Sequence, residues 1–204
     1  MMPGGIGIGT VAVRRLVATD RPRRPTFEVV LERSAIDDIH AHGAARTDIE
    51  VCGVMVGNVY RDELGPYLYV EAVIRGNAAA GRSTQVTFTD ETWTTIHAEL
   101  ERAHAGRRIV GWYHTHPGFG VFLSDMDLFI QDNFFNLSWQ VAFVHDPVRH
   151  EDGLFVWRGG QSVPEPFLIE GTPVAAPAAA PGSAGRQPGR VRTWFDRWRR
   201  GGEA

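Results

Sequence analysis

The stretch from residue 111 to 127 limits what this chain can fold into more than any other part of the sequence. The run 108–113 is short, apolar and partly β-branched or aromatic, which predicts a buried strand. His114 and His116 follow it directly. Residues two apart on a strand point to the same face, so both imidazoles can reach one ion.

A turn and a helix start come after the two histidines. Pro117, Gly118 and Gly120 interrupt regular structure. Ser124 then stands at a predicted helix N-cap, and Asp127 lies three residues further on, on the same helix face. Two histidines and one carboxylate, with a fourth position left to water, form the ligand set of a catalytic zinc site.

Each half of this pattern also has a plainer interpretation. A strand histidine is often a hydrogen-bonded core residue. Ser-x-x-Asp at a helix start is a common capping pattern that needs no metal. The two halves together, joined by a Gly/Pro turn at this spacing, favour a metal site.

The pattern H-x-H-P followed by S-x-x-D resembles the JAMM motif of the Mov34/MPN/PAD-1 (MPN+) zinc metalloproteases. That family also has a Glu just before an apolar strand near the start of the domain, and Glu50 before Val51–Val59 matches it. The resemblance covers residues 26–170 and is densest at 49–57 and 109–147. The motif is similar to that of the proteasome-lid and signalosome isopeptidases, and less like that of the shorter bacterial members that act on sulfur-carrier proteins.

The resemblance implies an α/β fold, a single cytidine-deaminase-like MPN domain with a mixed, curved β-sheet flanked by helices. It also implies one Zn²⁺ per chain, held by His114, His116 and Asp127. Glu50 would accept a proton from the zinc-bound water, and Ser124 would hydrogen-bond the developing oxyanion. The expected activity is that of a metalloprotease that hydrolyses peptide or isopeptide bonds.

The substrate implied by the resemblance is the Gly-ended tail of a ubiquitin-like protein or its conjugates, held by strand addition. In the family, an insertion that corresponds to the loop 75–83 helps to hold this tail. The residues expected to bind substrate lie beside that loop and in the turn of the motif: Thr84, Gln85, Val86, Gly118, Phe119 and Gly120.

Three other functions stay open. A JAMM hydrolase can act on a sulfur-carrier precursor or a small amide, and the sequence does not separate these substrates. A non-catalytic MPN scaffold is disfavoured, because such relatives have lost ligand residues and all five functional positions are present here. A zinc deaminase would need a Glu beside its first histidine and a paired Cys motif, and the sequence has neither.

The composition, 43% apolar and 22% charged residues in 204, is that of a soluble globular protein. The single cysteine, Cys52, cannot form an internal disulfide, which favours a reducing, cytoplasmic location. Cys52 shares a predicted strand face with Glu50, where a small buried filler is favoured over a fourth ligand or a nucleophile. An overall charge of −3, with the basic residues of 186–204 set against an acidic body, argues against a nucleic-acid partner.

Neither a membrane span nor a signal peptide is expected. No apolar run approaches the ~20 residues that cross a bilayer, and Gly and Arg interrupt the N-terminal segment.

The chain divides into four regions: a segment 1–25 with a candidate edge strand at Thr10–Leu16, a catalytic domain 26–170, an Ala/Pro/Gly-rich linker 171–190, and a basic Trp/Arg tail 191–204. Within the tail, 191–200 carries two tryptophans four residues apart among arginines. This stretch is a candidate contact for a partner protein or an anionic membrane surface.

Hydrophobic periodicity predicts the elements of the domain. Helices are predicted from Ser34 to about Ala45, from a cap at Asp90 to about His104, and after Ser124. Besides 108–113, strands are predicted at Thr26–Leu31, Val51–Val59, Tyr67–Ile74, Gln85–Phe88, Trp139–Val144, Leu154–Trp157 and Phe167–Glu170, with a turn at His150–Gly153.

Overall fold

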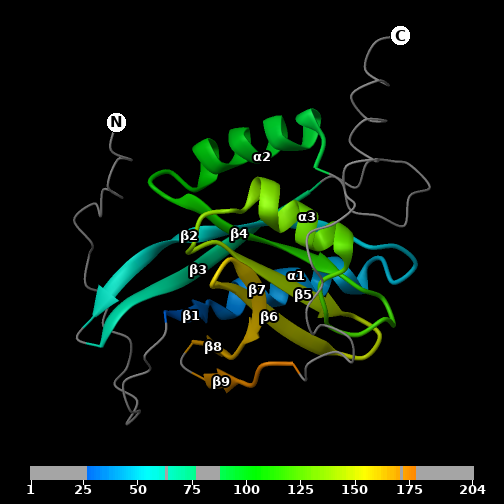
Figure 1. Ribbon diagram of the computed structural model, residues 1–204. Coiled ribbons are helices and arrows are strands. Elements are labelled where there is room, and N and C mark those ends of the chain that lie inside the picture. The colour runs from blue at the N-terminus through cyan, green and yellow to red at the C-terminus, as the bar shows by residue number, and fades with distance from the viewer. Residues whose placement is uncertain (1–26, 63, 77–87, 171, 178–204) are drawn as a thin grey trace.

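The computed structural model describes residues 27–62, 64–76, 88–170 and 172–177 (Figure 1). These residues form a nine-stranded mixed sheet in the order β7-β6-β5-β4-β2-β3-β1-β8-β9. Its strands are β1 (Glu28–Leu31), β2 (Cys52–Asp62), β3 (Gly65–Arg75), β4 (Arg108–Thr115), β5 (Val141–Asp146), β6 (Glu151–Arg158), β7 (Gln161–Glu165), β8 (Phe167–Ile169) and β9 (Thr172–Val174). The helices are α1 (Arg33–Ala44), α2 (Asp90–Ala103) and α3 (Asp125–Phe134).

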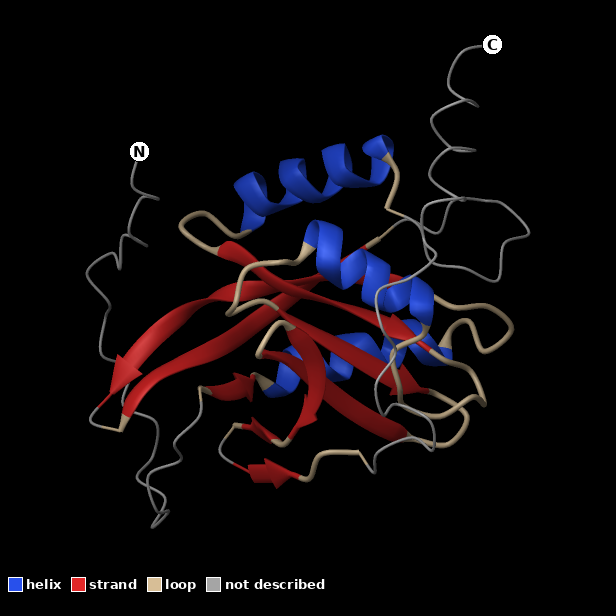
Figure 2. Ribbon diagram, viewed as in Figure 1, coloured by secondary structure: helices blue, strands red, loops and turns tan. Residues whose placement is uncertain are grey.

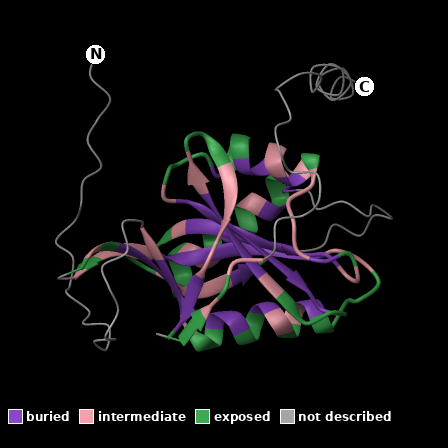
Figure 3. Ribbon diagram, turned by 60° about the horizontal axis from the view of Figure 1, so that its bottom comes forward, coloured by how far each residue is buried: buried purple, intermediate pink, exposed green. Residues whose placement is uncertain are grey.

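The helices cover both faces of the sheet (Figure 2). Helix α1 buries Ile36 and Ile39 in the apolar core on one face. Helices α2 and α3 bury Ile96 and Ile130 on the other face, together with Trp112 of β4. Figure 3 shows the buried residues concentrated in the strands between these two layers. The predicted α/β fold, a mixed curved sheet flanked by helices, is confirmed.

Strand β4 lies near the middle of the sheet, with one antiparallel and one parallel neighbour. It pairs antiparallel with β2, where Cys52 faces His114, and parallel with β5, where His145 faces Thr115. Its last residues are therefore held on both sides by backbone hydrogen bonds, and this fixes the direction in which the chain leaves the sheet.

Two helix starts differ from the prediction. The N-cap of α1 is Glu32, whose side chain makes no capping bond, so Ser34 lies inside the helix rather than at its start. The N-cap of α2 is Thr89, whose hydroxyl accepts a hydrogen bond from the Thr92 amide, and Asp90 is the first helical residue. Ser, Thr and Asp all suit helix starts, so composition alone places a cap only to within a residue or two.

Two short edge strands were not predicted, and the turn after β5 lies earlier than predicted. Strand β7 is largely polar and contains Pro164, which an edge strand tolerates, and within the described part of the chain β9 pairs with β8 alone. Strand β9 lies within 171–190, so the sheet continues into the range predicted as linker. Strand β6 begins at Glu151, which leaves the turn at 147–150 rather than 150–153.

Several predicted elements lie outside the described residues: the candidate strand Thr10–Leu16, residues 85–87 and the tail 191–204. Among the helices that are described, none has the length and apolarity needed to cross a bilayer.

A half-buried histidine, His42, ties α1 to β4. A hydrogen bond of 2.8 Å joins His42 Nδ1 and the Tyr113 hydroxyl. Burial lowers the pKa of His42 to about 4, and the nearby Arg75 acts in the same direction. Below the ordinary pKa of 6.5 the unfolded chain takes up a proton that the folded chain does not. Stability should therefore fall as the pH drops from there towards about 4.

We expect His42 to lower the free energy of unfolding by about 1–2 kcal/mol between neutral pH and about pH 4.5. The effect is no larger because solvent partly screens a half-buried charge. Urea unfolding in the presence of a chelator would measure the loss in the wild type and in His42→Gln. The substitution should flatten the pH dependence by that amount. Equal slopes in the two proteins would contradict the assignment.

Candidate metal centre

Three side chains converge at the C-terminal end of β4. Ligand atoms of His114, His116 and Asp127 all lie within 4.8 Å of one another, and all three residues are buried. The two Nε2 atoms are 3.1 Å apart. Asp127 places Oδ1 3.3 Å from His114 Nε2 and Oδ2 3.5 Å from His116 Nε2.

Strand β4 aims the first histidine. Trp112 and His114 are two residues apart, so they share the face that α3 covers. Their rings stack, with centroids 4.5 Å apart. His116 lies just beyond the strand, and its Nδ1 is 3.3 Å from the Gly120 carbonyl oxygen. A hydrogen bond donated by Nδ1 to that carbonyl leaves the Nε2 lone pair for a metal.

Helix α3 brings in the aspartate. Asp127, Ile130 and Gln131 are its buried residues, spaced as one face of a helix requires. Gln131 fixes that face to the sheet by accepting a 2.7 Å hydrogen bond from Trp112 Nε1. The predicted capping pattern is confirmed. The Ser124 hydroxyl accepts from the Asp127 amide, and the Asp127 carboxylate accepts from the Ser124 amide.

The antiparallel register of β2 and β4 places the glutamate. Cys52 pairs with His114, and two residues outwards the same register sets Glu50 opposite His116. The Thr115 amide donates to the Val51 carbonyl, which continues the ladder past the strand ends. Glu50 Oε1 consequently lies 3.9 Å from His116 Nε2. Burial raises the pKa of the Glu50 carboxyl, so it is a stronger base than an exposed glutamate.

The three converging groups fit a zinc ion. Metal–ligand bonds of about 2.0 Å in a tetrahedron set ligand atoms about 3.3 Å apart, close to the separations found here. Burial lowers the pKa of His114, so its ring is neutral, as a ligand must be. Burial alone would raise the pKa of Asp127, but the two imidazoles and the Ser124 hydroxyl hold it well below its usual range. The carboxylate is therefore ionised.

The turn between strand and helix is held by an aspartate that sequence reasoning did not single out. Asp146, at the end of β5, accepts hydrogen bonds of 2.9 Å from the Gly118 amide and 2.7 Å from the Gly120 amide. Both glycines have positive φ, 81° and 84°, which other residues rarely adopt. Phe119 between them is 70% exposed. The Asp-Pro pair that ends β5 indicates only the local turn at 147–150, and no sequence signal points from it to the glycines.

The remaining candidate residues lie in different places, and none of those described belongs to the three converging groups. Thr84, Gln85 and Val86 lie outside the described residues. Cys52 is buried with its thiol pKa raised to about 12, chiefly by burial, which suits an inert core residue. His145 is in a separate side-chain group, and its backbone carbonyl accepts a hydrogen bond from the His116 amide.

The fold and this centre define a class: an α/β domain with a buried His₂Asp group and a glutamate at one end of its central strands. The chain belongs to the JAB1/Mov34/MPN/PAD-1 ubiquitin protease family, whose model matches residues 26–138. The predicted family is thereby confirmed.

Similar proteins from other organisms support this membership. The 26S proteasome non-ATPase regulatory subunit 14 of Drosophila melanogaster is 33% identical over 68% of this chain and 44% of its own. Ubiquitin carboxyl-terminal hydrolase RPN11 of Saccharomyces cerevisiae is 32% identical over 68% of this chain and 45% of its own. An uncharacterized Caenorhabditis elegans protein is 32% identical over 80% of this chain. The chain spans about half the length of these curated relatives.

A solved structure shows the same fold. A protein from Desulfitobacterium hafniense, determined in solution, matches 69% of this chain and 91% of its own with a TM-score of 0.51 and 20% identity. At this identity the likeness concerns the fold alone.

Proposed function

We propose that this protein is a zinc-dependent isopeptidase that cleaves after the Gly-ended tail of a ubiquitin-like protein. The observation that carries the proposal is the convergence of His114, His116 and Asp127, with the Glu50 carboxylate beside them. Family membership supports it, as do the two relatives named as a proteasome regulatory subunit and a ubiquitin carboxyl-terminal hydrolase.

The three ligands would hold the ion and leave its remaining position open. A zinc ion there would supply Lewis-acid polarisation of a carbonyl and would lower the pKa of a nearby water molecule. Glu50 takes the proton of the attacking water and passes it to the leaving amine, so the carboxylate is regenerated in each turnover. Its desolvated position raises its pKa, which favours the first of these transfers.

Ser124 is the candidate oxyanion donor. Its hydroxyl donates a 2.6 Å hydrogen bond to Asp127 Oδ2. To stabilise an oxyanion, the hydroxyl has to turn away from this carboxylate towards the substrate. The Ser124 amide also donates to Oδ2, at 2.7 Å, so the aspartate keeps a partner when the hydroxyl turns.

The turn at Gly118–Gly120 is the candidate substrate contact among the described residues. Asp146 fixes its backbone, and the two glycines carry no side chain that would keep a peptide away. Phe119 projects into solvent, where it can cover an apolar residue of an incoming tail.

Cleavage assays with three substrates test the proposal: an isopeptide-linked ubiquitin conjugate, a linear ubiquitin-like fusion ending in Gly-Gly, and a sulfur-carrier fusion. With zinc we expect release after the terminal Gly-Gly of the ubiquitin-like substrates, seen as a product of defined mass. A chelator should abolish this release. Cleavage of the sulfur-carrier fusion alone would favour the alternative substrate class. No cleavage by zinc-loaded protein would favour a non-catalytic scaffold.

A further inference from the structure

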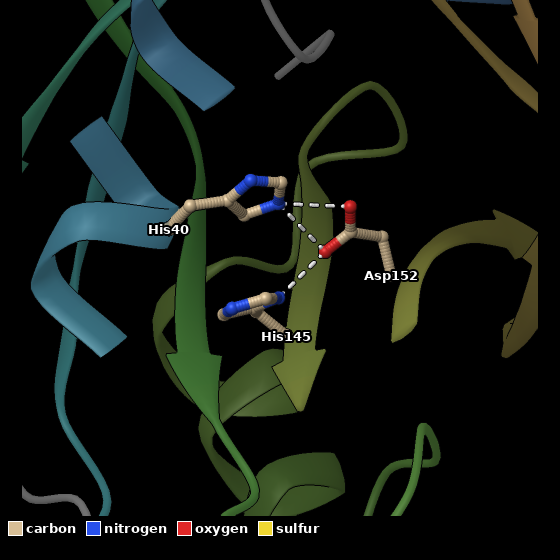
Figure 4. Close-up of side chains that lie close together, drawn as sticks. All are labelled: His40, His145 and Asp152. Carbon is tan, nitrogen blue, oxygen red and sulfur yellow. Dashed lines mark hydrogen bonds and ion pairs between the residues drawn. The ribbon is translucent and has the colours of Figure 1, made fainter. Parts of the chain in front are cut away.

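A second group of metal-binding side chains lies apart from the candidate centre. His40 of α1, His145 of β5 and Asp152 of β6 bring ligand atoms within 4.8 Å of one another. Figure 4 shows the two rings directed at one carboxylate. His40 Nε2 lies 2.9 Å and 3.1 Å from the two Asp152 oxygens, and His145 Nδ1 lies 2.8 Å from Oδ1.

The fold holds the three residues in place. His145 and Asp152 are directly paired in the antiparallel β5–β6 ladder. Helix α1 approaches this ladder closely because Gly43 has no side chain. A Cβ there would lie 2.9 Å from His145 Cδ2. His40, one turn earlier on α1, stacks on His145 with ring centroids 4.4 Å apart.

The chemistry of the group matches that of the first. Each offers two imidazole nitrogens and one carboxylate, and among the described residues these are the two groups of three that could hold an ion. The side chains of His145 and Asp152 are 5% and 16% exposed, whereas His40 is 39% exposed, so solvent reaches the group from the α1 side. Hydrogen bonds from the two rings to Asp152 explain the present distances, and an ion entering from that side would take the place of those hydrogen bonds.

We propose that His40, His145 and Asp152 form a second zinc site that cross-links helix α1 to strands β5 and β6. Two imidazoles and a carboxylate are zinc ligands, and solvent would complete the tetrahedron. The His145 carbonyl accepts a 2.9 Å hydrogen bond from the His116 amide. The second ion would thus restrain the backbone that carries His116. The proposal does not depend on isopeptidase activity.

Zinc stoichiometry tests the proposal directly. Full-length protein without a histidine tag is dialysed against low-micromolar zinc, and the bound metal is measured by mass spectrometry. We expect two ions per chain in the wild type and one in Asp152→Asn or His40→Gln. His42→Gln is the matched control, because it removes a histidine of the same helix that is not in the group, and it should keep two.

A second experiment isolates the site from the first. In the Asp127→Asn background, which lacks a ligand of the first centre, zinc at a hundredfold excess over its dissociation constant should raise the unfolding temperature by roughly 5 °C or more. Adding Asp152→Asn should remove that shift.

Two results would overturn the proposal: no zinc-dependent rise in the unfolding temperature of Asp127→Asn, or an Asp152→Asn variant that binds as many ions as the wild type. Either result would mean that the three side chains form a hydrogen-bonded network without a metal. A failure of cleavage with two ions bound would instead count against the proposed function alone.

Discussion

Glu50→Gln is expected to lower kcat by roughly 10²–10⁴ and to leave the zinc content unchanged. The amide has nearly the shape of the carboxylate but cannot accept the proton of the attacking water. Glu50 Oε1 is 3.9 Å from His116 Nε2, so the residue lies beside the ligands without belonging to the three that converge. Cleavage kinetics together with metal analysis would measure both effects.

Asp48→Asn is the matched control for this prediction. Asp48 is an exposed acid two residues away, paired with Arg46 on the surface, so its loss should change neither rate nor metal content. If Glu50→Gln cleaved as fast as the wild type, the assignment of the base would be wrong. If the variant lost zinc, Glu50 would have to be counted as a ligand.

Asp127→Asn should reduce the zinc content by one ion per chain and cleavage to background. The carboxylate is buried between two imidazoles, and its charge is what draws a cation to that point. Losing a direct ligand should weaken binding by more than the roughly 10–100-fold that follows the loss of an outer-shell partner. Asparagine can still accept the Ser124 hydrogen bonds, so helix α3 should remain intact.

Asp125→Asn separates the ligand effect from the charge effect. Asp125 is an exposed acid in the same first turn of α3 and is not one of the three converging residues, so its amide variant makes the same change of charge near the centre while keeping all three. It should bind zinc like the wild type. Equal zinc loss in both variants would mean that helix charge, rather than ligation, governs binding. Circular dichroism would verify that α3 is still folded.

These two variants also separate the possible failures of the proposed function. Glu50→Gln tests the chemistry with the metal in place, whereas Asp127→Asn tests the metal with the base in place. A chain that binds zinc but cleaves none of the substrates would keep the metal centre and lose the enzymatic role.

Much of the candidate centre was predictable because its spacing is local. Two residues apart on a strand share a face, which places His114 and His116 together. Three residues apart at a helix start share a turn, which joins Ser124 and Asp127 in a capping box. The apolar runs likewise predicted most of the sheet, because buried central strands carry a strong hydrophobic signal. The edge strands β7 and β9 carry little of it, and they were missed.

The contacts across the fold were not contained in those local patterns. A resemblance could point to Glu50, but only the register of β2 against β4 sets it opposite His116. Asp146 is 26 residues from the Gly120 amide that it accepts from, and no periodicity links them.

The sequence by itself determined which side chains leave the β4 strand end and the α3 helix start together, because backbone geometry repeats every two residues in a strand and every 3.6 in a helix. The tertiary structure alone decided which residues far apart in the sequence come into contact. His40 and Asp152 are 112 residues apart, and they face each other because Gly43 lets α1 pack closely on the β5–β6 ladder. Such contacts depend on packing between elements, which the residue spacing within one element does not encode.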